Sequence, residues 1–141
     1  MRNFIGIDLN EIIYKLGPAI KSNNITHWSM KECYIGVPGA TFLFNTFRDM
    51  NSLEELWIDC GDEEEGFSDL DDDIMAGCIP SLAACTGMRK LKLNYMNMGT
   101  NSWASLSGVF PRMAALLELI LCGNAIDDDC ARVLVRGLAG C

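Results

Sequence analysis

A run of carboxylates from Asp62 to Asp73 contains the residue types that most readily suggest chemistry in this chain. Closely spaced carboxylates are typical Ca²⁺ ligands, and a calcium-binding loop places glycine sixth and glutamate twelfth. Counted from Asp62, the sixth residue is Phe67 and the twelfth is Asp73, so both places break the pattern. Acidic residues are also common at a helix start, where they face unpaired N–H groups. We therefore predict a solvated acidic loop that leads into a helix, with a divalent-ion site as the alternative.

Candidates for nucleophilic catalysis are few. His27 is the only histidine, and no serine, cysteine or carboxylate stands at a recognisable motif spacing from it. Cys122 is expected to be exposed, but Arg112 is the only basic residue among the ten that precede it. The sequence contains no glycine-rich phosphate loop and no zinc-protease motif. Apart from the divalent-ion alternative above, it predicts a protein that is not an enzyme and has no catalytic residue, metal or cofactor.

The elements that must position these residues follow a phrase that occurs five times: an apolar residue, two others, an apolar residue, one other, and an apolar residue. The phrases are Phe4–Ile7–Leu9, Ile25–Trp28–Met30, Leu53–Leu56–Ile58, Met88–Leu91–Leu93 and Leu116–Leu119–Leu121. Their last residues are separated by 21, 28, 35 and 28 positions. Such a period indicates a solenoid, in which each unit buries its apolar face by stacking on its neighbours.

The apolar stripe of a helix follows most of these phrases. The stripe residues, 13 and 17 positions after the phrase, are Leu43 and Phe47, Leu106 and Phe110, and Leu134 and Leu138. In the third unit, Cys78 and Leu82 match only after seven extra residues. We therefore place an acidic insertion at about 61–70, between a strand and a helix.

The phrase, followed three residues later by asparagine or cysteine, resembles a leucine-rich repeat. The period of 28 with one helix per unit resembles the ribonuclease-inhibitor type. Asn124 and Cys33 stand at the asparagine or cysteine position, whereas Gly61 and Met96 depart from it. The resemblance implies that this side chain bonds backbone groups in the turn after the strand. It also implies one α/β leucine-rich-repeat solenoid over residues 1–141, with parallel strands on the concave face and helices on the convex face of about five repeats.

Several functions follow from the resemblance. The ribonuclease-inhibitor type occurs in enzyme inhibitors, in GTPase activators for Ran and in sensor regions of NOD-like receptors. A GTPase activator would need polar or basic side chains on the rim of turns beside the strands, where Asp and Glu dominate here. We therefore predict a protein–protein interaction module without catalysis, and the alternative is a GTPase-activating or enzyme-inhibiting regulator.

The exposed side of the strands is the predicted contact surface. Alternate strand residues point to opposite sides of a sheet, so the neighbours of the inward phrase residues should be exposed. One such row is Asp8, Ser29, Trp57, Lys92 and Ile120, and the next is Asn10, Lys31, Asp59, Asn94 and Cys122. Large apolar groups ringed by polar residues are typical of protein interfaces. The predicted partner-binding residues are Trp57, Asp59, Lys92, Asn94, Tyr95 and Ile120.

Composition narrows the class of partner. The 141 residues carry a net charge of −8, which disfavours nucleic acid and anionic membranes. No uncharged apolar run is long enough to span a bilayer. Seven cysteines without a framework spacing favour a reduced, cytoplasmic protein. The sequence shows no polar capping unit at either end, so we expect a segment of a longer array or self-association through the ends.

Overall fold

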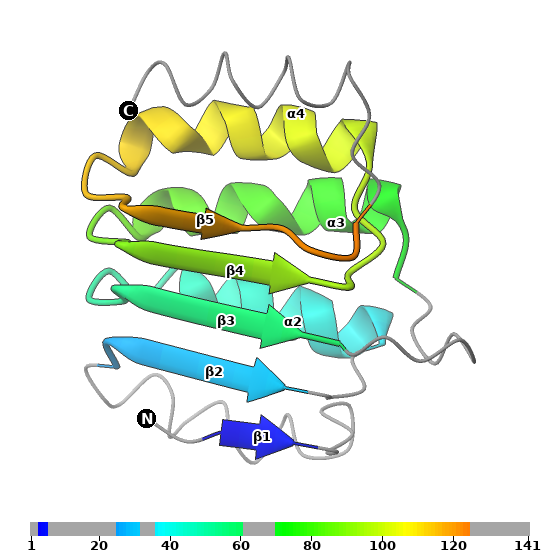
Figure 1. Ribbon diagram of the computed structural model, residues 1–141, viewed down its shortest axis with the longest axis horizontal. Coiled ribbons are helices and arrows are strands. Elements are labelled where there is room, and N and C mark those ends of the chain that lie inside the picture. The colour runs from blue at the N-terminus through cyan, green and yellow to red at the C-terminus, as the bar shows by residue number, and fades with distance from the viewer. Residues whose placement is uncertain (1–2, 6–24, 32–35, 61–69, 125–141) are drawn as a thin grey trace.

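The computed structural model describes residues 3–5, 25–31, 36–60 and 70–124, with no side-chain description for residues 3–5. Five strands form one parallel sheet in the order in which they occur along the chain (Figure 1). They are β1 (Asn3–Ile5), β2 (His27–Lys31), β3 (Glu55–Asp59), β4 (Lys90–Asn94) and β5 (Glu118–Ile120). Because neighbouring parallel strands run the same way, each connection must return the chain to the starting edge of the sheet.

Helices lie in the connections between β2 and β5, and they cover one face of the sheet (Figure 1). They are α2 (Val37–Phe47), α3 (Asp72–Cys78) with the 3₁₀ turn η1 (Ile79–Ala84), and α4 (Thr100–Val109) with η2 (Phe110–Arg112). Strand and helix therefore alternate from β2 to β5. The predicted α/β class is confirmed for the described residues.

The strands pair in register from β2 to β5. Met30 lies opposite Ile58, and Ile58 lies opposite Leu93. All three side chains are fully buried, as the repeated phrase predicts. Leu121, the corresponding residue after β5, is partly buried and packs against the same core.

The register of β1 differs from the prediction. The phrase Phe4–Ile7–Leu9 predicts that Leu9 lies beside Met30, but the sheet pairs Phe4 with Met30. The spacing to the next unit is then 26 residues rather than 21, closer to the 28 that separate later units. The shorter spacing would leave fewer residues for the return segment. Asn3 and Ile5, rather than Asp8 and Asn10, therefore lie opposite Ser29 and Lys31.

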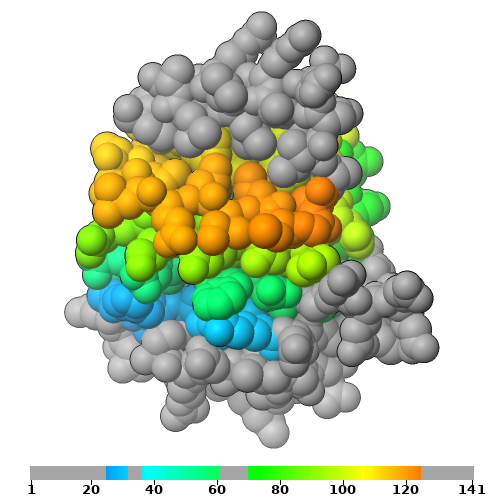
Figure 2. All heavy atoms as spheres, in the orientation of Figure 1, coloured from blue at the N-terminus to red at the C-terminus, as the bar shows by residue number. Residues whose placement is uncertain are grey.

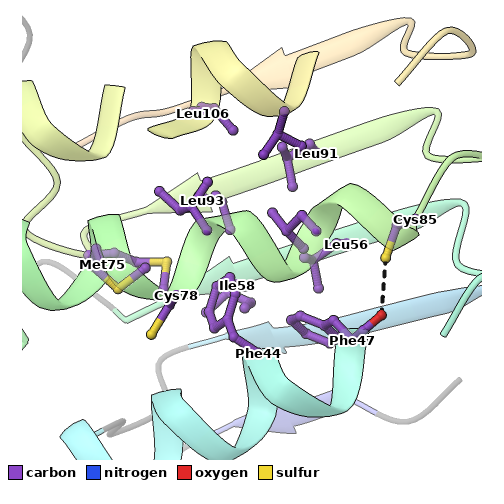
Figure 3. Packing of buried hydrophobic residues seen from close by; sticks show 14 of the residues in the cluster. Phe44, Phe47, Leu56, Ile58, Met75, Cys78, Cys85, Leu91, Leu93 and Leu106 are labelled. Atoms are coloured by element: carbon purple, nitrogen blue, oxygen red, sulfur yellow. Dashed lines mark hydrogen bonds between the residues drawn. The ribbon is translucent and has the colours of Figure 1, made fainter. Parts of the chain in front are cut away.

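The core lies between the sheet and the helices. The predicted stripe residues Leu43, Phe47, Cys78, Leu82, Leu106 and Phe110 are all buried. Figure 3 shows side chains of β3 and β4 meeting those of the helices, and Phe44 and Phe47 pack edge to face at 5.2 Å between ring centroids. Burying one large apolar side chain contributes about 1.5–3 kcal/mol relative to leaving it exposed.

The acidic residues at the start of α3 behave as helix-start residues. Asp71 is the N-cap, and its side chain accepts a hydrogen bond of 2.8 Å from the backbone N–H of Ile74. Asp72 and Asp73 occupy the first turn. The acidic segment lies between β3 and α3, and residues 61–69 of it lie outside the described residues, as do the predicted helix residues Leu134 and Leu138.

Cys85, in the next unit, bonds backbone oxygens at and after the C-terminal end of α2. Its thiol is fully buried and donates to the backbone oxygens of Phe47, at 3.5 Å, and Met50, at 3.6 Å (Figure 3 shows the first). Burial raises the pKa of the Cys85 thiol to about 11. Cys122, in contrast, is exposed, as predicted.

Alkylation should therefore discriminate strongly between the two thiols. In the folded protein at pH 8, iodoacetamide should modify Cys122 within minutes and leave Cys85 unmodified, because only about one Cys85 thiol in a thousand is then ionised. Peptide mapping by mass spectrometry measures both sites, and a sample in urea should label them equally. Equal labelling without urea would show that Cys85 is not enclosed.

Candidate functional site

The face of the sheet opposite the helices carries five of the six predicted contact residues. We call it the open sheet face. Its side chains, on β2 to β5, are His27, Ser29, Lys31, Glu55, Trp57, Asp59, Lys90, Lys92, Asn94, Glu118 and Ile120. Figure 2 shows the molecule from this side, with the strands as successive bands. The register arranges these residues in rows, one of which runs from Ser29 through Trp57 and Lys92 to Ile120.

Trp57 lies at the centre of this face. The ammonium group of Lys31, on β2, lies 3.6 Å from the centroid of the Trp57 ring, and that of Lys92, on β4, lies 4.6 Å from it. Each contact is a cation–π interaction, worth about 0.5–2 kcal/mol depending on its exposure. The indole Nε1 of Trp57 is buried and has no hydrogen-bond partner among the described residues. Lysines from β2 and β4 therefore both contact the Trp57 ring of β3.

A chain of polar contacts runs along one edge of the face. Oγ1 of Thr26 lies 2.7 Å from Nδ1 of His27, and Nε2 of His27 lies 3.1 Å from a carboxylate oxygen of Glu55. The other oxygen of Glu55 lies 3.6 Å from the ammonium nitrogen of Lys90. The sequence carried no motif for this arrangement, because Glu55 reaches His27 only through the pairing of β2 with β3.

This hydroxyl, imidazole and carboxylate are the groups of a proton relay, but their surroundings favour a structural role. His27 and Glu55 keep 48% and 35% of their side-chain surface exposed. The backbone N–H groups of Glu54 and Glu55 both donate to the carbonyl of Thr26, so they are not available to stabilise an oxyanion. Exposed pairs of this kind contribute about 0–1 kcal/mol to stability.

A hollow of about 290 Å³ opens between β2, β3 and β4 on this face. It is lined by His27, Trp28, Ser29, Glu55, Leu56, Trp57, Lys90 and Lys92. Trp57 supplies the apolar side chain on this face, because the side chains of Trp28 and Leu56 are buried in the core, and the charged groups among the described lining residues are two lysines and one glutamate. Such a mixture suits a small group that is partly apolar and partly charged.

Four of the six predicted contact residues lie on this face with part of their surface exposed, as the sequence analysis expected. Trp57, Asp59, Lys92 and Ile120 are all partly exposed, and Ile120 lies opposite Lys92 in the register. Lys31, which stood in a predicted exposed row but not among the six predicted contact residues, contacts Trp57 diagonally from β2. Its contribution depends on side-chain direction, which strand spacing alone does not give.

The expectation of an exposed Asn94 is wrong, because the residue is only 7% exposed. Asn94 Oδ1 accepts a hydrogen bond of 3.0 Å from the backbone N–H of Cys122. The paired residues of β4 and β5 end at Lys92 and Ile120, so the Asn94 side chain satisfies a backbone donor beyond them. Asn94 therefore ties two units together and is not available to a partner.

Tyr95 lies beyond the end of β4, in a turn rather than in a strand row. Its backbone has a left-handed conformation, with φ of 56°. Its ring rests on Gly123, where an added Cβ would lie 2.2 Å from Cδ1 of Tyr95. Gly123 itself has φ of 71°, which side chains rarely tolerate.

Replacing Gly123 with alanine should therefore destabilise the protein by about 2 kcal/mol, from backbone strain and from the displaced ring. Urea denaturation monitored by circular dichroism measures the loss. In a Tyr95→Ala background the same substitution should cost about half as much, because only the strain remains. An equal cost in both backgrounds would argue against the ring contact.

The turns that follow β4 and β5 are joined by asparagine side chains. Asn124 Oδ1 accepts from the backbone N–H groups of Met96, at 3.0 Å, and Met98, at 3.1 Å. Its Nδ2 donates to the backbone oxygen of Leu93 at 2.7 Å. Asn97, one place beyond the departing residue Met96, donates to the oxygen of Leu70 in the preceding unit. Asn124 Nδ2 also lies 3.2 Å from the backbone oxygens of Leu121 and Cys122, so this side chain bonds the backbone at the end of its own strand as well as that of the preceding unit.

Asp72 makes a second link between units, which the sequence analysis missed. The N-cap of α4 is Gly99, which has no side chain to accept the first N–H groups of the helix. Asp72, from α3, takes this role by accepting from the backbone N–H groups of Gly99, Asn101 and Ser102 and from the Ser102 hydroxyl, at 2.6–2.9 Å. A Cβ on Gly99 would lie 3.2 Å from the Asp72 carboxyl carbon, so glycine lets the carboxylate approach.

These bonds also shift the titration of Asp72. Burial alone raises the pKa of this carboxyl, but the hydrogen bonds from Ser102, Asn101 and Gly99 outweigh burial and hold the pKa below its ordinary value of 3.8. The charged form is therefore the one that the fold stabilises.

The described part of the chain contains neither a candidate metal-ligand cluster nor a candidate membrane-spanning helix. Within it, no group of three or more histidine, cysteine, aspartate or glutamate side chains could hold a metal ion. The acidic residues 62–69, on which the calcium alternative depends, lie outside that part. None of the described helices combines the length and the hydrophobicity needed to cross a bilayer.

Comparison with known proteins identifies no family or relative from which the site could be interpreted. No protein-family model matches the chain. The search of curated proteins finds no match either.

Proposed function

We propose that this chain is a leucine-rich-repeat solenoid of the ribonuclease-inhibitor type that binds a protein partner through its open sheet face and has no catalysis of its own. The observation that carries the proposal is Trp57, a large aromatic side chain held between Lys31 and Lys92 at the centre of a sheet face opposite the helices. Tryptophan and tyrosine anchors surrounded by polar groups dominate the binding energy of many protein interfaces.

The solenoid part of the proposal has three supports. The strands follow one another in sequence order, and the helices cover one face (Figure 1). β2 to β5 pair without offset, so equivalent residues of successive units stand side by side. Asn124 and Asn97 each bond the backbone of a preceding unit. Five strands about 4.8 Å apart give the binding face a width of roughly 20 Å.

Site-directed photocrosslinking tests the binding part. A benzoylphenylalanine placed at Ser29 or Ile120 lies on the open sheet face, and the same residue at Asn45 of α2 or Ala104 of α4 lies on an exposed helix position. Each variant is irradiated in native extract, and the products are separated by mass. The proposal expects the same crosslinked species from both sheet positions and not from the helix positions.

The Trp57→Ala variant of each sheet-position protein is the matched control, and it should lose at least nine-tenths of that product while keeping its circular dichroism spectrum. Products that form equally from helix and sheet positions, or that persist without Trp57, would contradict binding through this face.

A further inference from the structure

The hydrogen-bonding groups around the hollow on the open sheet face are unevenly matched. The indole N–H of Trp57 has no acceptor among the described residues, but its nitrogen is buried, so this donor is not exposed to an occupant. The ammonium groups of Lys90 and Lys92, which also line the hollow, each offer three donors. Among the described residues of the lining, Glu55 is the one carboxylate, and it already faces both His27 and Lys90. Acceptors are therefore what an occupant of this hollow would have to supply.

Lys90 and Lys92 form ion pairs that are longer than a hydrogen bond, so each can still donate to another acceptor. Lys90 lies 3.6 Å from Glu55, and Lys92 lies 3.9 Å from Glu118. Charge-assisted hydrogen bonds between ammonium and carboxylate groups are about 2.7–2.9 Å long. At the longer separations, each lysine attracts its carboxylate without donating a short hydrogen bond to it.

The local charge also differs from that of the whole molecule. The open sheet face carries three lysines, Lys31, Lys90 and Lys92, against three carboxylates, Glu55, Asp59 and Glu118. The chain as a whole has a net charge of −8. The hollow itself, with two lysines and one glutamate in its lining, has a formal charge of +1 when His27 is neutral. An acidic group therefore meets a more favourable potential here than the average over the molecule.

We propose that the hollow receives an aspartate or glutamate side chain of the protein partner, and that an apolar neighbour of this residue packs on Trp57. The carboxylate oxygens accept hydrogen bonds from the ammonium groups of Lys92 and Lys90. The apolar side chain of the partner packs against the Trp57 ring. This inference rests on the proposed function, since it names the chemistry of the partner at the same face.

Selection from a phage-displayed library of random twelve-residue peptides tests it on the full chain. The folded protein is the bait, and peptides are kept when they fail to bind Trp57→Ala. The retained peptides are then titrated against Lys92→Glu. The matched control is Arg112→Glu, which changes the net charge equally at an exposed position in η2, outside the open sheet face. Circular dichroism verifies that all variants fold.

The inference expects the retained peptides to share an aspartate or glutamate beside an apolar residue. Their Kd should rise at least tenfold with Lys92→Glu, about 1.4 kcal/mol, and less than twofold with Arg112→Glu. Retained peptides without an acidic residue, or peptides that bind Lys92→Glu unchanged, would overturn the acidic occupant while leaving binding through Trp57 intact. If no peptide depends on Trp57, both the occupant and the proposed function are contradicted.

Discussion

Replacing Asn124 with alanine is expected to lower the free energy of unfolding by roughly 3 kcal/mol. The substitution leaves the backbone N–H groups of Met96 and Met98 and the oxygen of Leu93 without the partner that they have now. The side chains of Met96 and Met98 are fully buried, so water cannot easily replace the lost bonds. An unsatisfied buried donor or acceptor costs about 1–3 kcal/mol, and part of the sum is relieved by relaxation.

Urea denaturation followed by tryptophan fluorescence measures this loss. Asn124→Asp is the matched control, because it keeps the acceptor oxygen for Met96 and Met98 but cannot donate to Leu93. It should therefore cost less than alanine. If alanine costs less than about 0.5 kcal/mol, the range of ordinary surface substitutions, the bonds between the turns do not hold the units together.

Replacing Asp72 with alanine is expected to cost about 2–3 kcal/mol, the second largest effect. The carboxylate accepts three backbone N–H groups at the start of α4 and the hydroxyl of Ser102. Loss of an ordinary N-cap costs about 0.5–2 kcal/mol, and this one also joins two units with charge-assisted bonds. Asp73→Ala is a suitable comparison, because Asp73 is exposed and, within the described part of the chain, accepts only from the side chain of Asn101.

The Asp72 contribution should also depend on pH in a defined direction. Because the folded pKa lies below the ordinary 3.8, the charged carboxylate stabilises the fold at pH values above 3.8. This stabilisation is lost as the pH falls from that value through the folded pKa. The stability difference between wild type and Asp72→Ala, from urea midpoints, should be constant from pH 5 to 7 and shrink below pH 4. A constant difference down to pH 3 would show that the charge of Asp72 is not involved.

Much of the fold was predictable because strand period and repeat period act together. Alternation placed Met30, Ile58 and Leu93 inward, and the shared phase then fixed which residues stand beside one another. The same reasoning placed Trp57 and Lys92 on the open face. It failed for β1, because Phe4–Ile7–Leu9 matches the apolar phrase while the sheet uses Asn3–Ile5.

The links between units were not predictable from one sequence. Asp72 and Gly99 are 27 residues apart, and nothing in the acidic run distinguishes the carboxylate that caps α4 from its neighbours. Asn94 has the phase of an exposed residue, but its side chain turns to the backbone of Cys122, where the paired residues of β4 and β5 have ended. Glu55 joins His27 only because two strands pair. In each case a polar side chain satisfies a group that tertiary structure brings to it.

Nuclear Overhauser contacts between methyl groups in the folded protein test the account most directly, because every side-chain position on the open sheet face follows from the strand register. With Ile, Leu and Met methyl groups labelled, we predict contacts that join Met30 to Ile58, Ile58 to Leu93, and Leu56 to Leu91. Contacts that instead join Met30 to Leu56, or Ile58 to Leu91, would show a shifted register. Trp57 would then have no fixed place between Lys31 and Lys92, and the binding face derived from it would be wrong.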